Sequence, residues 1–92
     1  MIASFRHKGL KLMFETGKAR YVRADLRERV VDILAVLHAS ATPADADLPG
    51  FRLHQLHGKD RGVWSITVSG NWRITFRFAN GNAEDVDLLD YH

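Results

Sequence analysis

The 92-residue sequence contains no cysteine, only two prolines and no long apolar run. The absence of cysteine excludes a disulfide, a thiolate nucleophile and a zinc–thiolate site, so any catalysis must use His, Asp, Tyr, Lys or Arg. A membrane-spanning helix needs roughly 18 to 20 consecutive apolar residues. The first ten residues also lack the apolar core and cleavage site of a signal peptide. We therefore expect a cytoplasmic protein.

The composition is that of an ordinary folded domain. Hydrophobic residues make up 46% of the chain and charged residues 26%, which argues against disorder. Residues 1–92 are expected to form one domain, because domains typically contain about 100 to 200 residues. The net charge is only +2, but basic residues concentrate in 1–30 and 51–82, and acidic ones in 31–50 and 83–92. This segregation suits a polyanionic partner such as RNA, although a mixed solvated surface explains it equally well.

Helical periodicity dominates the N-terminal half. A short helix is expected within residues 7–17, ending at Gly17. A longer helix is expected within residues 24–40, with Asp25 as its N-cap and Glu28 completing an acidic capping box. The apolar face of the longer helix comprises Leu26, Val30, Ile33, Leu34 and Leu37.

After Pro49 the apolar residues alternate, which predicts an antiparallel sheet. Three alternating segments follow one another from Trp64 onward, and residues 51–56 are expected to add a fourth strand. Three-residue turns at 69–71 and 80–82 would keep the apolar side chains of neighbouring strands opposite one another. The fold class predicted is α+β, with two N-terminal helices packed on one face of an antiparallel meander. The pairs expected are Val68 with Trp72, Phe76 with Val86, Ile74 with Leu88 and, on the other face, Asn71 with Tyr91.

That other face of the predicted sheet gathers side chains that can perform acid–base chemistry. The same register places Arg73 diagonally next to Tyr91, with His54 two strands away. The last strand runs into Asp90, Tyr91 and His92. Strand pairing would hold this end of the chain beside an arginine and a histidine, whereas most termini are poorly ordered.

Cleavage of RNA is a reaction that these residue types can carry out. The 2′-hydroxyl of RNA is the nucleophile, so a metal-independent ribonuclease needs a base, an acid for the leaving 5′-oxygen and cations for the charged phosphorane. We expect His54 and His92 to transfer the protons, in either order, and Arg73, with Lys59 or His57, to stabilise the transition state. Asp90 would orient a histidine, and Tyr91 would stack on a base or bind the phosphate. The basic residues expected to bind substrate are Arg52, His57, Lys59 and Arg61.

Each of these residues also has an ordinary structural explanation. His54 could simply occupy the polar face of the sheet, and His57 and Lys59 could belong to a solvated turn. Arg73 and Arg77 could form weak surface ion pairs with the acidic residues of the last strand. The coincidence of all of them on one face favours a functional site.

A metal site formed by His54, His57, Asp90 and His92 is a weaker interpretation. Residues three apart on a strand point to opposite faces, so the two central histidines chelate poorly. No glycine-rich phosphate loop, nucleophile elbow or dinucleotide-binding fingerprint is present. We expect no metal and no cofactor.

The sequence resembles the HigB-type toxins, the plasmid-maintenance killer proteins of the RelE/ParE superfamily. The resemblance runs along nearly the whole chain and is carried by "SFRHKGLKLMFETG", "RLHQLHG", "WSITVSGNWRITFRF" and "DYH". It implies a RelE-like α+β fold, a small helix-turn-helix antitoxin of the HigA type and an endoribonuclease that cuts mRNA in the A site of the ribosomal 30S subunit. The active-site motif of the family falls on His54, Arg73, Asp90, Tyr91 and His92.

One position departs from the family pattern. His57 stands where the relatives have lysine, which moves a positive charge to Lys59 or makes it dependent on pH. Two other functions stay open. The ParE branch of the superfamily inhibits a topoisomerase by binding, and a plain RNA-binding or ribosome-associated domain would use the basic segments alone.

Overall fold

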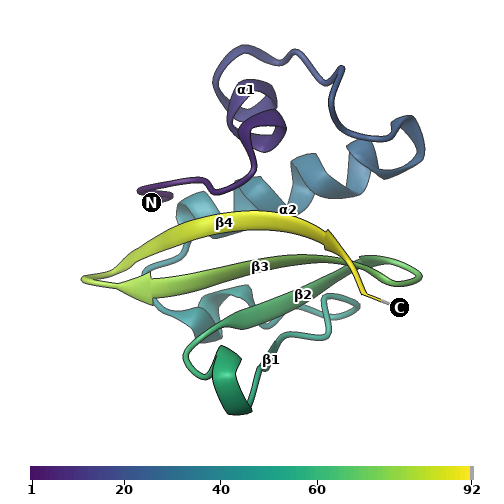
Figure 1. Ribbon diagram of the computed structural model, residues 1–92. Helices are drawn as coiled ribbons and strands as arrows, with labels where there is room; N and C mark the ends of the chain where they lie inside the picture. The colour runs from purple at the N-terminus through teal and green to yellow at the C-terminus, as the bar shows by residue number, and fades with distance from the viewer. Residues whose placement is uncertain (92) are drawn as a thin grey trace.

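The computed structural model describes residues 1–91 and consists of two helices on one face of a four-stranded antiparallel sheet (Figure 1). The α+β prediction is confirmed. The helices are α1 (Lys8–Thr16) and α2 (Arg27–Ala39). The strands are β1 (His54–Gln55), β2 (Trp64–Ser69), β3 (Trp72–Ala79) and β4 (Asn82–Asp90), and they lie side by side in chain order. The short 3₁₀ helices are η1 (Ala24–Leu26), η2 (Pro43–Ala46) and η3 (Gly58–Asp60). No helix within residues 1–91 is long and apolar enough to cross a membrane.

The ends of the helices follow local hydrogen bonding. α1 is capped by His7, whose Nδ1 accepts a hydrogen bond from the Leu10 amide at 3.1 Å. It ends at Gly17 as predicted, with a left-handed φ of 80° that glycine adopts without strain. The predicted capping role of Asp25 is wrong. Asp25 lies in the η1 turn that leads into α2, and its carboxylate binds Arg23 at 2.9 Å instead.

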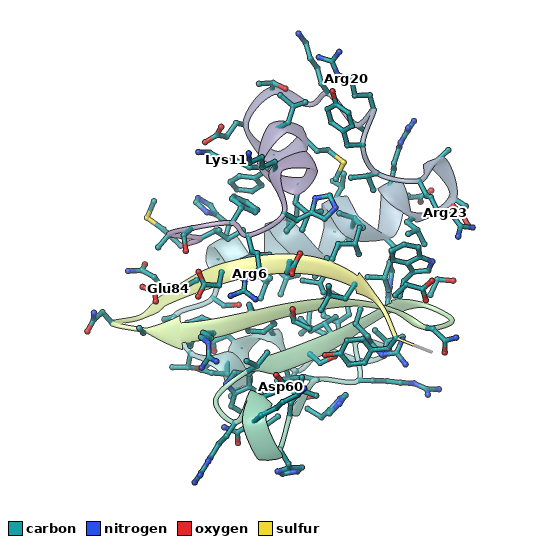
Figure 2. All side chains as sticks on the ribbon, in the orientation of Figure 1. Arg6, Lys11, Arg20, Arg23, Asp60 and Glu84 are labelled. Atoms are coloured by element: carbon teal, nitrogen blue, oxygen red, sulfur yellow. The ribbon has the colours of Figure 1, made fainter. Side chains whose placement is uncertain are left out.

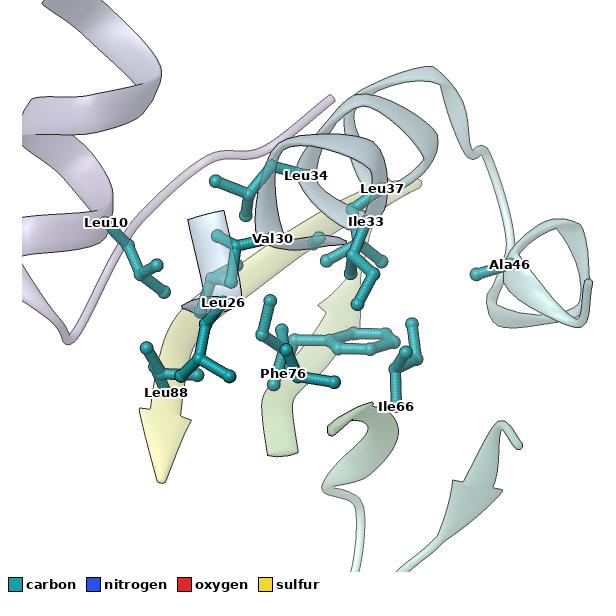
Figure 3. Close-up of a cluster of buried hydrophobic side chains, with 14 of the residues drawn as sticks. Leu10, Leu26, Val30, Ile33, Leu34, Leu37, Ala46, Ile66, Phe76 and Leu88 are labelled. Atoms are coloured by element: carbon teal, nitrogen blue, oxygen red, sulfur yellow. The ribbon is translucent and has the colours of Figure 1, made fainter. Parts of the chain in front are cut away.

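α2 supplies the centre of the hydrophobic core (Figure 3). The five residues of its predicted apolar face are all nearly inaccessible to solvent. They pack against the inner face of the sheet, where burial of a large aliphatic or aromatic side chain contributes about 1.5 to 3 kcal/mol. The inner-face residues of this core are Ile66, Ile74, Phe76, Val86 and Leu88. One face of the sheet is therefore fully used for folding.

The hairpins use two-residue turns, so the predicted three-residue turns are wrong. Gly70 and Asn71 connect β2 to β3, and the φ of 55° at Gly70 is typical of a type II′ turn. Asn80 and Gly81 connect β3 to β4 with φ values of 55° and 79°, as in a type I′ turn. Primed turns fit the right-handed twist of paired strands.

A β-bulge next to each turn restores the register that the sequence predicted. One bulge falls at Val68 and the other opposite Phe76, where Asp85 has a φ of 53°. Each bulge inserts one residue, so Ile74 still pairs with Leu88, as expected. The expected pairs of Val68 with Trp72 and of Phe76 with Val86 fall at the bulges and do not form.

Both edges of the sheet are short or covered. The strand predicted over residues 51–56 is reduced to β1, because Arg52 adopts a left-handed φ of 52° that interrupts extended structure. Phe51 is nevertheless buried, and its carbonyl accepts a hydrogen bond from the Thr67 amide at 2.8 Å. Along the opposite edge, residues 2–5 lie parallel to β4 and form bridges with it. This arrangement limits edge-to-edge pairing with other chains.

Candidate active site on the outer face of the sheet

The side chains of His54 and Arg73 lie on the face of the sheet turned away from the helices, here called the outer face. Residues opposite one another on paired strands project to the same face, so the register decides which of them are neighbours. One row across the sheet comprises His54, Ser65, Thr75 and Asp87. The next row comprises Thr67, Arg73 and Leu89. His54 and Arg73 therefore lie in adjacent rows, about 7 Å apart along the strand direction, and β2 lies between their strands, which adds about 9 to 10 Å across the sheet.

His54 is solvent-exposed on the edge strand β1. Its Nδ1 lies 3.2 Å from the carbonyl oxygen of Arg52. A carbonyl oxygen only accepts hydrogen bonds, so this contact requires a proton on Nδ1. In the neutral ring the other nitrogen, Nε2, then carries the free electron pair.

Arg73 is held by the adjacent hairpin. Its Nη1 donates hydrogen bonds to the carbonyl oxygens of Gly70 at 2.6 Å and Trp72 at 3.0 Å. Within residues 1–91, Nη2 and Nε make no hydrogen bond and remain able to bind an anion. The alternative ion pair between Arg73 and an acidic residue of β4 is not found among these residues.

Tyr91 is fixed beside the same hairpin. Its backbone amide donates a hydrogen bond to the Asn71 carbonyl at 2.8 Å, which confirms the predicted pairing of these two residues. Its side chain is 39% exposed. Tyr91 therefore lies diagonal to Arg73, as predicted, although the hydrogen bonds of the arginine run to the hairpin carbonyls. His92 lies outside the described residues.

The comparisons with known proteins show which family the chain belongs to. The family described as "RelE-like toxin of type II toxin-antitoxin system HigB" matches residues 3–92. The chain belongs to this HigB family. It is 45% identical to Endoribonuclease HigB of Proteus vulgaris over 92 residues, covering 100% of both chains. It is also 29% identical over 94 residues to Toxin HigB-1 of Vibrio cholerae serotype O1 (strain ATCC 39315 / El Tor Inaba N16961), covering 100% of this chain and 98% of that protein.

In this HigB-family toxin, Asp90 lies on the face of the sheet opposite to that of Arg73. Asp90 pairs with Trp72, and it follows the buried Leu88 by two residues along β4. Side chains two apart on a strand share a face, so Asp90 projects toward the helix side. The expectation that Asp90 shares a face with Arg73 is therefore wrong. Adjacent residues of a strand point to opposite faces, and Asp90 follows Leu89, which pairs with Arg73.

The four basic residues predicted to bind substrate divide into two groups. His57, Lys59 and Arg61 are exposed in the loop that joins β1 to β2 around η3. This loop lies at the end of the sheet opposite the hairpin that holds Arg73. Arg52 is exposed next to His54. Only Arg52 is thus adjacent to the central rows, and the loop is placed to contact a more distant part of an extended ligand.

The toxin also has a pocket of about 110 Å³ on the outer face, which sequence reasoning missed. Figure 2 shows two of its lining residues, Arg6 beside β4 and Asp60 in η3. Its other lining residues include Tyr91, Leu89, Val63, Thr75, Asp87 and Arg77. This pocket is called the outer-face pocket below. Alternation along β3 and β4 could have identified Thr75 and Asp87 as neighbours of Arg73.

No group of three or more His, Asp or Glu side chains suited to hold a metal ion occurs in the part of the chain that the structure describes. The metal interpretation needed His54, His57 and Asp90 to converge. Asp90 projects to the other side of the sheet from His54, so these residues do not form a common ligand set.

Proposed function

We propose that this HigB-family toxin is a ribosome-dependent endoribonuclease that cuts mRNA in the A site of the 30S subunit. The observation that carries the proposal is that His54 and Arg73 share the outer face, two strands apart, and that Tyr91 lies diagonal to Arg73. The 45% identity to a full-length relative named Endoribonuclease HigB supports the same reaction.

The chemistry proposed is metal-independent attack of the 2′-hydroxyl on the adjacent phosphodiester. His54 accepts the proton of the 2′-hydroxyl, because its contact with the Arg52 carbonyl leaves Nε2 unprotonated in the neutral ring. His92 donates a proton to the leaving 5′-oxygen. Each proton transfer typically contributes about 10²- to 10⁴-fold in rate.

Arg73 stabilises the negative charge that develops on the phosphorane. Its Nη1 is anchored to two carbonyl oxygens, which orients the guanidinium before substrate binds. A preorganised donor costs no reorganisation during the reaction and is worth more than a flexible one. Tyr91 stacks on a nucleobase with its exposed ring, and Asp90, two residues earlier in the chain, orients His92.

The loop cations position the message, with His57, Lys59 and Arg61 contacting phosphates away from the cut. The three carboxylates that line the pocket on the outer face, Asp60, Asp85 and Asp87, weaken its attraction for free RNA, which supports dependence on the ribosome for holding the mRNA. We further propose that the toxin acts in the cytoplasm and that a helix-turn-helix antitoxin of the HigA type neutralises it.

The proposal is tested by mapping the 5′ ends of messages in cells that express the wild type, Arg73→Ala or Arg20→Ala. Arg20 is an exposed arginine on the helix side of the molecule and serves as the matched control (Figure 2). We expect new in-frame cuts with the wild type and with Arg20→Ala, and few or none with Arg73→Ala. Toxicity without any cut message would favour the topoisomerase-binding alternative.

A further inference from the structure

The outer-face pocket contains polar groups that the proposed mechanism leaves unused. Thr75 lines the pocket and is only 5% exposed, yet its hydroxyl makes no hydrogen bond within residues 1–91. Its neighbour in the row, Ser65, is fully buried, and its Oγ also has no hydrogen-bond partner there. Ser65 does not line the pocket, whereas the Thr75 hydroxyl is available there to a polar ligand, and hydroxyls of buried residues are normally satisfied.

The charges around the pocket argue against a phosphate as this ligand. Asp60, Asp85 and Asp87 line it together with Arg6 and Arg77. None of these five forms an ion pair with another within the described residues. Three carboxylates repel a phosphate group, whereas Arg73, just beyond the pocket wall, attracts one.

The remaining walls fit a flat ring with polar edges. Tyr91, Leu89 and Val63 offer an aromatic ring and two aliphatic surfaces. Aromatic side chains stack on unpaired bases in RNA recognition. A pocket of about 110 Å³ is smaller than the roughly 300 to 1,000 Å³ of drug-sized ligand sites, so it suits a single base.

We propose that the outer-face pocket receives one unpaired nucleobase of the substrate RNA, next to the cleaved phosphodiester, and selects a base with an exocyclic amino group over uracil. This inference rests on the proposed nuclease function and adds the specificity of its site. Leu89, which pairs with Arg73 and also lines the pocket, places the base beside the phosphate that Arg73 binds.

Asp87 is the main selecting residue. Its Oδ1 accepts a hydrogen bond from the Leu88 amide at 2.9 Å, which fixes the carboxylate, and its second oxygen makes no hydrogen bond within residues 1–91. An ionised carboxylate only accepts hydrogen bonds. The amino groups of adenine, cytosine and guanine donate to it, whereas uracil has no amino group and its single N3–H donor is flanked by two carbonyl oxygens that the carboxylate repels. Thr75, opposite Asp87 in the register, can donate to a ring nitrogen or carbonyl.

The first test maps cleavage on ribosome-bound messages in which each base near the cut is varied in turn. We expect the wild type to avoid uracil at one position beside the cut, and Asp87→Asn to relax this discrimination about tenfold, because the amide of asparagine can donate to a uracil carbonyl. Thr75→Val, which keeps the side-chain shape, should weaken the same preference. Asp32→Asn changes an exposed carboxylate on α2 and should keep the wild-type preference.

Equal use of all four bases by the wild type, or an unchanged preference in both pocket variants, overturns the inference. A second test titrates AMP, CMP, GMP and UMP into ¹⁵N-labelled protein and follows the amide signals of Thr75, Asp87 and Leu89. Larger shifts with the three amino-bearing nucleotides than with UMP support the pocket, and equal or absent shifts count against it. If the wild type cuts no RNA at all, the nuclease proposal fails, and the titration alone then decides about the pocket.

Discussion

The backbone amide of Tyr91 donates a hydrogen bond to the carbonyl of Asn71 at 2.8 Å. This bond fastens the end of β4 to the β2–β3 hairpin, two residues before Arg73. The ends of most domains are poorly ordered unless they are paired in this way. Sites built on paired strands are positioned more precisely than sites on loops. The bond therefore holds the backbone of Tyr91 in the position diagonal to Arg73.

Replacement of Tyr91 should separate the contribution of its ring from that of its hydroxyl. Tyr91→Ala should lower kcat/KM for message cleavage by roughly tenfold to a hundredfold, because stacking of a base on an aromatic ring is worth about 1 to 3 kcal/mol. Tyr91→Phe keeps the ring and should retain most activity. Tyr21→Ala is the control, since Tyr21 is 66% exposed and precedes α2 on the other side of the molecule. Equal losses in the Phe and Ala variants would show that the hydroxyl, and not stacking, matters.

The loop cations should act on binding and not on the chemical step. Lys59→Ala combined with Arg61→Ala should weaken the salt dependence of RNA binding, by about 0.7 in slope for each phosphate that the loop no longer binds. The single-turnover rate at saturating ribosome-bound message should stay close to that of the wild type. Lys18→Ala combined with Arg20→Ala removes two exposed cations beyond α1 and serves as the control. A large fall in the saturated rate would instead place the loop at the reacting phosphate.

The type II′ turn predicts a stability cost at Gly70. Gly70→Ala should lower the free energy of unfolding by about 1 kcal/mol or slightly more, because a side chain is strained at a φ of 55° even though no atom obstructs it. For a domain of this size the melting temperature should fall by about 4 to 8 °C for each kcal/mol. Asn71→Ala, at the next turn position, should change it much less. Thermal unfolding followed by circular dichroism compares the two, and equal melting temperatures would rule out the turn assignment.

The pKa of Asp45 predicts a pH-dependent contribution to stability. Hydrogen bonds from the Ala41 amide and then the Thr42 amide, at 2.9 and 3.1 Å, lower the pKa of this carboxyl below its usual value. A carboxyl with a depressed folded-state pKa stabilises the fold above its unfolded pKa of about 3.9, and this stabilisation is lost as pH falls through the folded-state pKa. Asp45→Ala should therefore lower the urea midpoint at neutral pH, and its effect should be smaller at acid pH, below the folded-state pKa.

Asp47→Ala provides the control for this experiment, since Asp47 is an exposed aspartate just after the same 3₁₀ helix. A loss of stability in Asp45→Ala that is the same at both pH values would show that the amide hydrogen bonds do not depend on the charge of the carboxylate.

The sequence predicted the parts of the fold that depend on periodicity. The face of α2, the inner face of the sheet and the pairing of Arg73 with Leu89 all follow from the spacing of apolar residues. The turns were wrong because alternation fixes only which side chains share a face. A two-residue turn with a bulge and a three-residue turn place the distant pairs identically, and positive φ values at Gly70 and Asn80 distinguish them only in the structure.

The candidate site was predictable to the extent that it follows strand alternation. His54, Arg73 and Tyr91 lie on one face for that reason. Asp90 was predicted on the same face because it belongs to the same sequence motif as Tyr91. Alternation along β4 puts it on the other face of the sheet. The outer-face pocket depends on how Tyr91 and the β1–β2 loop surround the sheet, which residue spacing does not determine.

The central claim is that His54 transfers a proton at the outer face of the sheet. The most direct measurement is the single-turnover rate of cleavage of a message bound in the ribosomal A site, comparing the wild type with His54→Ala at equal occupancy. The account predicts a rate lower by about 10²- to 10⁴-fold, with an unchanged circular dichroism spectrum and melting temperature. A folded His54→Ala protein that cuts the message at the wild-type rate would contradict it.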